Sequence, residues 1–341
     1  MLRGAVDQPH GLGPIGPVST PRPWNAICTA AVELHMDQRD SKVVPWHRTM
    51  WPLLPLGSFR PLSATMQVEV AADCHPGKIK PYNEDNYLVL QVGRNQHVVT
   101  TSLSAAELPG TFNEQAYVMI VADGIGGVGA GAVASRLALS TVAQLALHFG
   151  KWNVRVDPAI AEDIMERMEW FYSRVQEAVT SHSLTDRGLS TMATAMTAAY
   201  SAGDDLFVAH IGHTRAYLLR DGQLTRLTRD HTLAAEGYPG PGPASAQHVT
   251  DDLRHILTHA IGGGFSGSGV QVEHFRLMHG DCLLLCSNGL TDLVDDYRIA
   301  DVLANRRRLD EQCRALINLA VDSGGPDNIT VVLAQYAMPQ L

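Results

Sequence analysis

Acidic side chains stand beside glycines and tight turns at several points in this chain. Asp123 lies between an apolar run and Gly124, and Asp327 follows a Gly-Gly-Pro turn. Glu84 and Asp85 are adjacent in the sequence YNEDN. Hard divalent cations such as Mg²⁺ and Mn²⁺ prefer carboxylate and carbonyl oxygens as ligands. These residue types therefore predict a divalent metal site, provided that the fold brings the four acids together.

The glycines after Asp123 have a second interpretation. The sequence GIGGVG (124–129) matches the GxGxxG pattern of dinucleotide-binding folds, between an apolar run and a helical pattern. However, Asp123 would place a carboxylate beside the pyrophosphate, and no strand ending in an acid follows about 20 residues later. We therefore prefer the metal site, while the dinucleotide alternative predicts cofactor binding that does not depend on Mn²⁺.

Apolar periodicity predicts the elements that would position these acids. Helices are expected over 131–149, from Asp157 to about 179, over 299–305 and over 309–323. Strands are expected over 117–122, 194–200, 206–211, 215–220, 223–227, 270–277, 282–287 and 329–336. Asp221-Gly222 is a strong signal for a two-residue hairpin. The order of these elements predicts an α+β fold with packed sheets.

Composition argues against several classes of protein. Of 341 residues, 45% are hydrophobic and 18% charged, which is typical of a folded soluble chain. The sequence contains no run of about 18 apolar residues that could form a membrane-spanning helix. The net charge of −9, without a basic run, argues against nucleic acid and membrane partners. Five cysteines without a CxxC pair fit a reducing compartment. We therefore expect a cytoplasmic protein.

Residues 1–65 differ from the rest of the chain. They are rich in proline, contain several tryptophans and show no sustained hydrophobic period. We expect a poorly ordered extension there and one folded domain over 66–337. Met66 is a candidate natural start, because the first alternating strand pattern begins at this residue.

Five segments, in order, resemble the bacterial form of the metal-dependent Ser/Thr protein phosphatases of type 2C. They are GKIKPYNEDN (77–86), VADGIGGVGAGAVAS (121–135), VAHIGHTRAYLLRDGQLTRLTRDHT (208–232), GDCLLLCSNGLTDLV (280–294) and GGPDNITVVLA (324–334). The resemblance implies a β-sandwich of two antiparallel sheets flanked by helix pairs, with a metal centre at one end. It also implies hydrolysis of phosphoserine and phosphothreonine in proteins, with Mn²⁺ or Mg²⁺ as cofactor.

The resemblance assigns roles to the acids. Asp123 would bridge two metal ions, the Gly124 carbonyl would bind one of them, and Asp327 would bind the second. Glu84 and Asp85 would hold metal-bound waters. Two divalent ions can activate water for attack on phosphorus without a covalent intermediate on the protein.

Lys80 stands where this family usually has an arginine that grips the phosphate. Lysine supplies the positive charge without the bidentate fork of arginine, so a weaker grip on substrate is expected. The other matching residues in these segments, Arg215, Asp230 and Asp292, are expected to be structural.

Two positions depart from the metal-binding pattern of the family. Asn288 replaces the aspartate of the usual SDG, and His213 replaces the aspartate of the usual GDSR. Asn288 loses one unit charge, an interaction on the order of 4 kcal/mol at about 4 Å in a dielectric near 20, before screening and solvation. His213 could bind Mn²⁺, but we favour a hydrogen-bonded turn histidine. We therefore expect two ions and a weak or absent third.

Two functions are consistent with these residues. The first is a Ser/Thr phosphatase, weakened in activity, that acts as a monomer on proteins phosphorylated by a Ser/Thr kinase. The second is a pseudophosphatase that uses the same fold as a regulatory or phosphoprotein-binding module. The enzyme is preferred because all four acids are present. Substrate choice would depend on the loops over 232–255 and 262–269.

Overall fold

The computed structural model of the chain describes residues 66–104, 112–127, 129–150, 156–237, 253–265, 269–305 and 307–338. The extension predicted over 1–65 lies outside these residues. So does most of the loop over 232–255, together with residues 266–268 of the loop over 262–269.

One antiparallel sheet has the strand order β1-β11-β10-β6-β7. Its strands are β1 (Gln67–His75), β6 (Arg215–Arg220), β7 (Gln223–Arg226), β10 (Cys282–Cys286) and β11 (Ile329–Ala337). Between β6 and β7, Asp221 and Gly222 have φ values of 50° and 79°. A two-residue type I′ turn requires left-handed backbone at both positions, so the predicted hairpin is confirmed.

The second sheet is also antiparallel, in the order β2-β3-β4-β5-β9, with the short strand β8 paired to β4. Its strands are β2 (Asn86–Gln96), β3 (Phe112–Ile125), β4 (Ala193–Ala202), β5 (Asp205–Ile211), β8 (Ile261–Gly262) and β9 (Gln271–Arg276). The dinucleotide alternative requires a parallel βαβ unit, and the antiparallel pairing of β3 with β4 shows that it was wrong.

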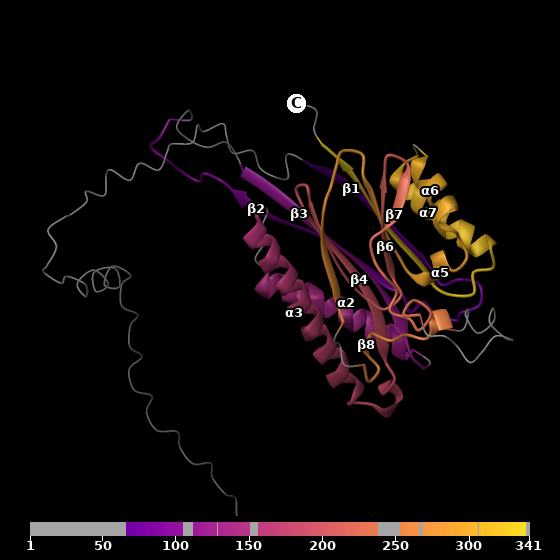
Figure 1. Cartoon of the computed structure of the whole chain (residues 1–341). Coiled ribbons are helices and arrows are strands. Elements are labelled where there is room, and N and C mark those ends of the chain that lie inside the picture. The colour runs from indigo at the N-terminus through magenta and orange to yellow at the C-terminus, as the bar shows by residue number, and fades with distance from the viewer. Residues whose placement is uncertain are drawn as a thin grey trace, which may run out of the picture. The chain divides into compact units, whose positions relative to one another are not determined.

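The two sheets pack face to face, and helices cover their outer faces (Figure 1). Met119 and Val121 of β3 meet Leu283 and Leu285 of β10 in the core between the sheets. α2 (Ala130–Phe149) and α3 (Pro158–Ser183) cover the β3–β4 face. α5 (Asn288–Thr291), α6 (Asp296–Ala304) and α7 (Leu309–Asp322) cover the other sheet. The predicted sandwich of two antiparallel sheets flanked by helices is confirmed.

Local signals set the ends of several helices. Asp157 caps α3 by accepting a hydrogen bond from the Ile160 backbone N–H at 2.9 Å, as predicted. α6 begins earlier than predicted, because Asp295 caps it by accepting from Arg298 N–H at 2.8 Å. By length and composition, α2 could cross a membrane, contrary to the expectation from the sequence. In this fold its buried side chains pack on the sheet instead.

Candidate functional site

Two loops meet at one end of the sandwich, the β1–β2 loop and the turn before β11, and Asn328 ties them together. Its side-chain oxygen accepts a hydrogen bond from the Glu84 backbone N–H at 2.8 Å. Its side-chain nitrogen donates to the carbonyls of Pro76 at 2.8 Å and Tyr82 at 3.0 Å. The loop between β1 and β2 is thereby fixed to the start of β11, beside Asp327. The sequence did not single out Asn328, although its place in GGPDN was a signal.

Lys80 contacts one of the predicted acids directly. Its Nζ lies 3.2 Å from Asp327 Oδ1, and the two side chains are 44% and 40% exposed. Partial burial lowers the pKa of Lys80, but the negative charges of Asp327, Asp123 and Glu84 outweigh this effect and raise the pKa. Lys80 is therefore a cation that lies among acids and remains accessible to a ligand.

Asp123 lies near the end of β3, opposite Ala195 of β4. The Thr194 hydroxyl donates a hydrogen bond to the Asp123 carbonyl at 2.8 Å. Burial, followed by the charge of Asp327, raises the pKa of Asp123 to about 7. The two central acids of the prediction, Asp123 and Asp327, therefore lie close enough for the charge of Asp327 to act on Asp123.

Gly124 and Gly131 explain the glycine-rich sequence without a nucleotide. A Cβ on Gly124 would collide with the Gly131 carbonyl and lie 2.7 Å from the Glu84 carbonyl oxygen. That Glu84 carbonyl also accepts a hydrogen bond from the Ser135 hydroxyl at 2.6 Å. Glycine is needed here because the end of β3, the start of α2 and the loop carrying Glu84 pack backbone to backbone.

Asp85, the residue after Glu84, is buried, with 3% of its surface exposed. Its Oδ2 is buried and has no hydrogen-bond partner among the described residues. Burial is the main cause that raises the pKa of Asp85 well above its usual value, and the nearby charge of Asp123 adds to it. We call Glu84, Asp85, Asp123 and Asp327 the acidic cluster. A cation bound in this cluster would satisfy the buried Asp85 oxygen, which has no hydrogen-bond donor.

His213 and Asn288 both border the acidic cluster. His213 Nδ1 lies 3.7 Å from Asp123 Oδ2 and has no hydrogen-bond partner among the described residues. The favoured interpretation of His213 as a hydrogen-bonded turn residue is therefore wrong for this nitrogen. The Asn288 side-chain nitrogen donates to Asp292 Oδ2 at 3.0 Å, whereas its oxygen is buried without a partner in the described part of the chain.

Asp292 belongs to this cluster, although the sequence placed it among the structural residues. It accepts the hydrogen bond from Asn288, and its charge is one of those that raise the pKa of Asp123. Arg215 and Asp230 bind each other, an arrangement that fits the structural role predicted for them. Their side chains form a bidentate pair with distances of 3.1 and 2.8 Å. Asp292 lies four residues after Asn288 in a helical turn, and this i, i+4 spacing was a signal that the sequence analysis did not use.

The chemistry of these donors fits a hard divalent cation. Within the described ranges, no three His, Cys, Asp or Glu side chains are grouped closely enough to form a complete metal site. The cluster nevertheless holds two buried oxygens without donors, on Asp85 and Asn288. Burial and neighbouring negative charges also raise the pKa values of Asp85 and Asp123. A divalent ion would satisfy the oxygens and offset the negative charge.

Known proteins share both the sequence pattern and the fold. A family model described as protein phosphatase 2C matches residues 109–320. The chain is 30% identical over 266 residues to serine/threonine phosphatase stp of Listeria monocytogenes, covering 77% of this chain and 94% of stp. It is 34% identical over 223 residues to serine/threonine protein phosphatase PstP of Mycobacterium tuberculosis, covering 64% of this chain and 40% of PstP.

Solved structures agree with the sequence matches. The crystal structure of the M. tuberculosis serine/threonine phosphatase PstP/Ppp has a TM-score of 0.61 and 29% identity, covering 79% of this chain and 98% of that chain. The catalytic domain of PstP in complex with 2 manganese ions has a TM-score of 0.60 and 28% identity, covering 80% and 100%. The convergence of acids described above occurs on the same fold. The chain belongs to the protein phosphatase 2C family.

Proposed function

We propose that this protein hydrolyses phosphoserine and phosphothreonine in other proteins and uses Mn²⁺ or Mg²⁺ as cofactor. The observation that carries this proposal is the contact of Lys80 with Asp327, at the end of the sandwich where Asp123 and Asp85 also lie. A cation beside a cluster of acids can hold a phosphate group next to the divalent ions that the acids bind. Family membership supports the same activity.

The proposed metal-holding groups share oxygen donors and converge at this end of the sandwich. They are the side chains of Asp123, Asp327 and Asn288, the carbonyl of Gly124, and, acting through water, Glu84 and Asp85. When bound, divalent ions lower the pKa of water and act as Lewis acids toward the phosphoryl oxygens. We propose that these groups bind two divalent ions, the number expected from the sequence.

Lys80 has the role of holding the phosphoryl group by charge. Its ion pair with Asp327 positions the ammonium beside a proposed metal-holding carboxylate. The ammonium is a point charge rather than a planar fork, so the orientation of the phosphate would depend more on the metal ions than it does with arginine.

Asn288 and His213 are proposed to weaken metal binding. Asn288 keeps a buried oxygen beside the site but contributes no charge, and its nitrogen is bonded to Asp292. Burial lowers the pKa of His213, so the imidazole is neutral near pH 7 and adds no positive charge beside Asp123. A third ion would therefore find two carboxylates fewer at this end of the site than in the usual family pattern.

The loop beside Lys80 presents two apolar side chains that could contact a phosphorylated peptide. Ile79 is 71% exposed and Tyr82 is 63% exposed. Hydrogen bonds hold the backbone on both sides of this segment. Lys78 N–H donates to the Gly325 carbonyl at 2.6 Å, and the Tyr82 carbonyl accepts from the Asn328 side chain. We propose that Ile79 and Tyr82 contact the residues that flank the phosphorylated side chain.

We also propose that residues 66–337 form the catalytic domain. The family match over 109–320 and the structural matches over about four fifths of the chain support this extent. The test of the proposed function is Mn²⁺-dependent release of phosphate from a phosphothreonine peptide by the full chain. The pseudophosphatase alternative predicts peptide binding without turnover.

A further inference from the structure

The β1–β2 loop carries two lysines beside the acidic cluster. The whole chain contains four lysines and has a net charge of −9, yet Lys78 and Lys80 lie only two residues apart on this loop. Lys80 forms an ion pair with Asp327, whereas Lys78 is exposed and forms no ion pair within the described part of the chain. The Lys78 ammonium is therefore available to an anionic group of another molecule.

The backbone of Lys78 is held beside the turn before β11. Its N–H donates a hydrogen bond to the Gly325 carbonyl at 2.6 Å. The preceding residue, Gly77, packs so closely here that a Cβ would collide with the Asp327 carbonyl, and its φ of 80° also favours glycine. The flexible Lys78 side chain thus extends from a fixed point close to Lys80, the cation proposed to hold the phosphate.

The spacing of the two lysines matches the spacing of side chains along an extended peptide. Two residues of fully extended chain span at most about 7 Å, so the Cα atoms of Lys78 and Lys80 lie no farther apart than this. Residues i and i+2 of an extended peptide point to the same side and are also about 7 Å apart. With the phosphate at Lys80, a side chain two residues from the phosphorylated residue can therefore reach Lys78.

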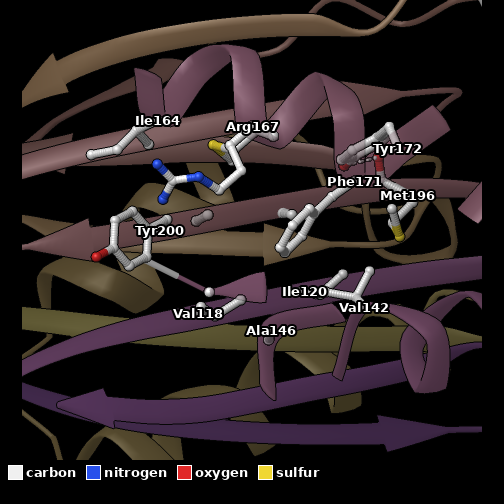
Figure 2. A pocket seen from close by; sticks show the side chains of 14 residues that line it. Val118, Ile120, Val142, Ala146, Ile164, Arg167, Phe171, Tyr172, Met196 and Tyr200 are labelled. Carbon is white, nitrogen blue, oxygen red and sulfur yellow. Dashed lines mark hydrogen bonds between the residues drawn. The ribbon is translucent and has the colours of Figure 1, made fainter. Parts of the chain in front are cut away.

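Two cavities in the described part of the molecule lie away from this loop. One, between α2, α3 and the β3–β4 face, has a volume of about 70 Å³ and a mostly apolar lining (Figure 2). The other is lined by Gln67, Gln115 and Ser201, near the ends of β1, β3 and β4 that are remote from the acidic cluster. Neither cavity adjoins Lys80, so contacts beside the phosphate are expected from exposed loop side chains.

We propose that Lys78 is a specificity-determining residue that selects phosphorylated segments with an acidic side chain two residues from the phosphothreonine. This inference rests on the proposed phosphatase activity and adds a charge contact to the apolar contacts proposed for Ile79 and Tyr82. An exposed ammonium–carboxylate pair gains little free energy and is screened by salt, so the selection is modest and strongest at low ionic strength.

Steady-state kinetics of the full chain on three phosphothreonine peptides tests the proposal. The peptides are identical except that each carries glutamate, glutamine or lysine two residues before and two residues after the phosphothreonine. The wild-type protein should prefer the glutamate peptide over the glutamine peptide by about three- to fivefold in kcat/KM at low salt, mainly through KM. The lysine peptide should be the poorest substrate, and 0.5 M salt should shrink these differences.

Substitutions at Lys78 should remove or invert this preference. Lys78→Gln should turn over the glutamate and glutamine peptides equally and stay within about twofold of the wild type on the glutamine peptide. Lys78→Glu should prefer the lysine peptide. Arg307→Gln is the matched control, because Arg307 is an exposed cation just before α7, whereas Gly325 follows the other end of this helix, about 20 Å away.

Turnover of the glutamine peptide separates this inference from the proposed function. If the wild type turns over that peptide but does not prefer glutamate at low salt, the role of Lys78 is overturned and the phosphatase activity stands. The role is also overturned if folded Lys78→Gln keeps the wild-type preference, or if Arg307→Gln loses it to the same extent as Lys78→Gln. Absence of turnover on all three peptides would overturn both.

Discussion

Lys80 Nζ lies 3.2 Å from Asp327 Oδ1, so the cation proposed to hold the phosphate is positioned by an acid proposed to hold the metal. The pairing couples the two halves of the site: a change at Lys80 alters the charge beside Asp327, and a change at Asp327 releases Lys80. Neither residue is fully buried, so both remain open to substrate and solvent.

Replacement of Lys80 should affect turnover more than folding. Lys80→Ala removes the charge that faces the phosphoryl group and should lower kcat/KM on a phosphothreonine peptide by about 100-fold. Lys80→Arg should raise kcat/KM a few-fold above the wild type, because a fork can bind two phosphoryl oxygens. Steady-state kinetics measures both. Activity of Lys80→Ala within twofold of the wild type would exclude this role.

Asn288→Asp should strengthen metal binding. The new carboxylate adds charge where a buried oxygen already lies, so the Mn²⁺ dissociation constant should fall by about tenfold or more. Calorimetric Mn²⁺ titration of full-length protein measures this directly, without reference to activity. Asn288→Ala is the matched control and should weaken binding. An unchanged dissociation constant in Asn288→Asp would place residue 288 outside the metal site.

Gly124→Ala should disrupt the site, whereas Gly127→Ala should be tolerated. A Cβ at Gly124 collides with the Gly131 carbonyl, while at Gly127 the nearest atom is Thr191 Oγ1 at 3.9 Å. Overpacking of this kind costs about 1–3 kcal/mol and displaces the backbone beside Asp123. Melting temperature and Mn²⁺ affinity should both fall in Gly124→Ala only. Equal effects in both variants would contradict the packing argument.

Tyr82→Ala should distinguish a peptide contact from the chemical step. Tyr82 is exposed beside Lys80, so its loss should raise KM for a phosphothreonine peptide several-fold. Turnover of p-nitrophenyl phosphate, which has no flanking residues, should not change. Tyr82→Phe should behave like the wild type if the contact is apolar. Parallel losses on both substrates would show instead that Tyr82 supports the loop.

The buried imidazole of His210 should make stability depend on pH. Burial is the main cause that lowers its pKa to about 3, and neutral His210 bonds to Thr197 Oγ1 at 2.8 Å and to the Arg229 carbonyl at 3.0 Å. An unfolded histidine titrates near 6.5, so the unfolded state gains protons first as the pH falls. This contribution to stability is therefore present above pH 6.5 and is lost progressively toward pH 3.

Urea unfolding between pH 7.5 and pH 4 measures this effect. His210→Gln should be less stable than the wild type at pH 7.5, and its stability should fall less steeply between pH 6.5 and pH 4. Identical slopes for the two proteins would show that His210 is not the titrating group.

The sequence predicted most elements because their signals are local. Asp157 before Pro158, Asp221-Gly222 and the apolar period of α2 each act within a few residues. The start of α6 was misplaced because its cap, Asp295, precedes the apolar period by several residues. The strand β2 was not predicted, although its register with β3 runs over its whole length.

Part of the candidate site was predicted because some of its residues also carry local sequence signals. The acids Glu84, Asp85, Asp123 and Asp327 were identified from their own neighbours, and the resemblance placed them together. Asn328 was missed because its partners are distant along the chain. Asp292 was expected to be structural, because its i, i+4 spacing from Asn288 was not considered. The direction of His213 toward Asp123 depends on the packing of β5 against β4, which no local pattern shows.

The most direct test of the proposed function is phosphate release by the full chain from a phosphothreonine peptide during Mn²⁺ titration, with Asp123→Ala as the control. We predict turnover that saturates with Mn²⁺ and is abolished in the folded Asp123→Ala variant. The absence of turnover at millimolar Mn²⁺ in folded wild-type protein would contradict the proposed function and favour the pseudophosphatase.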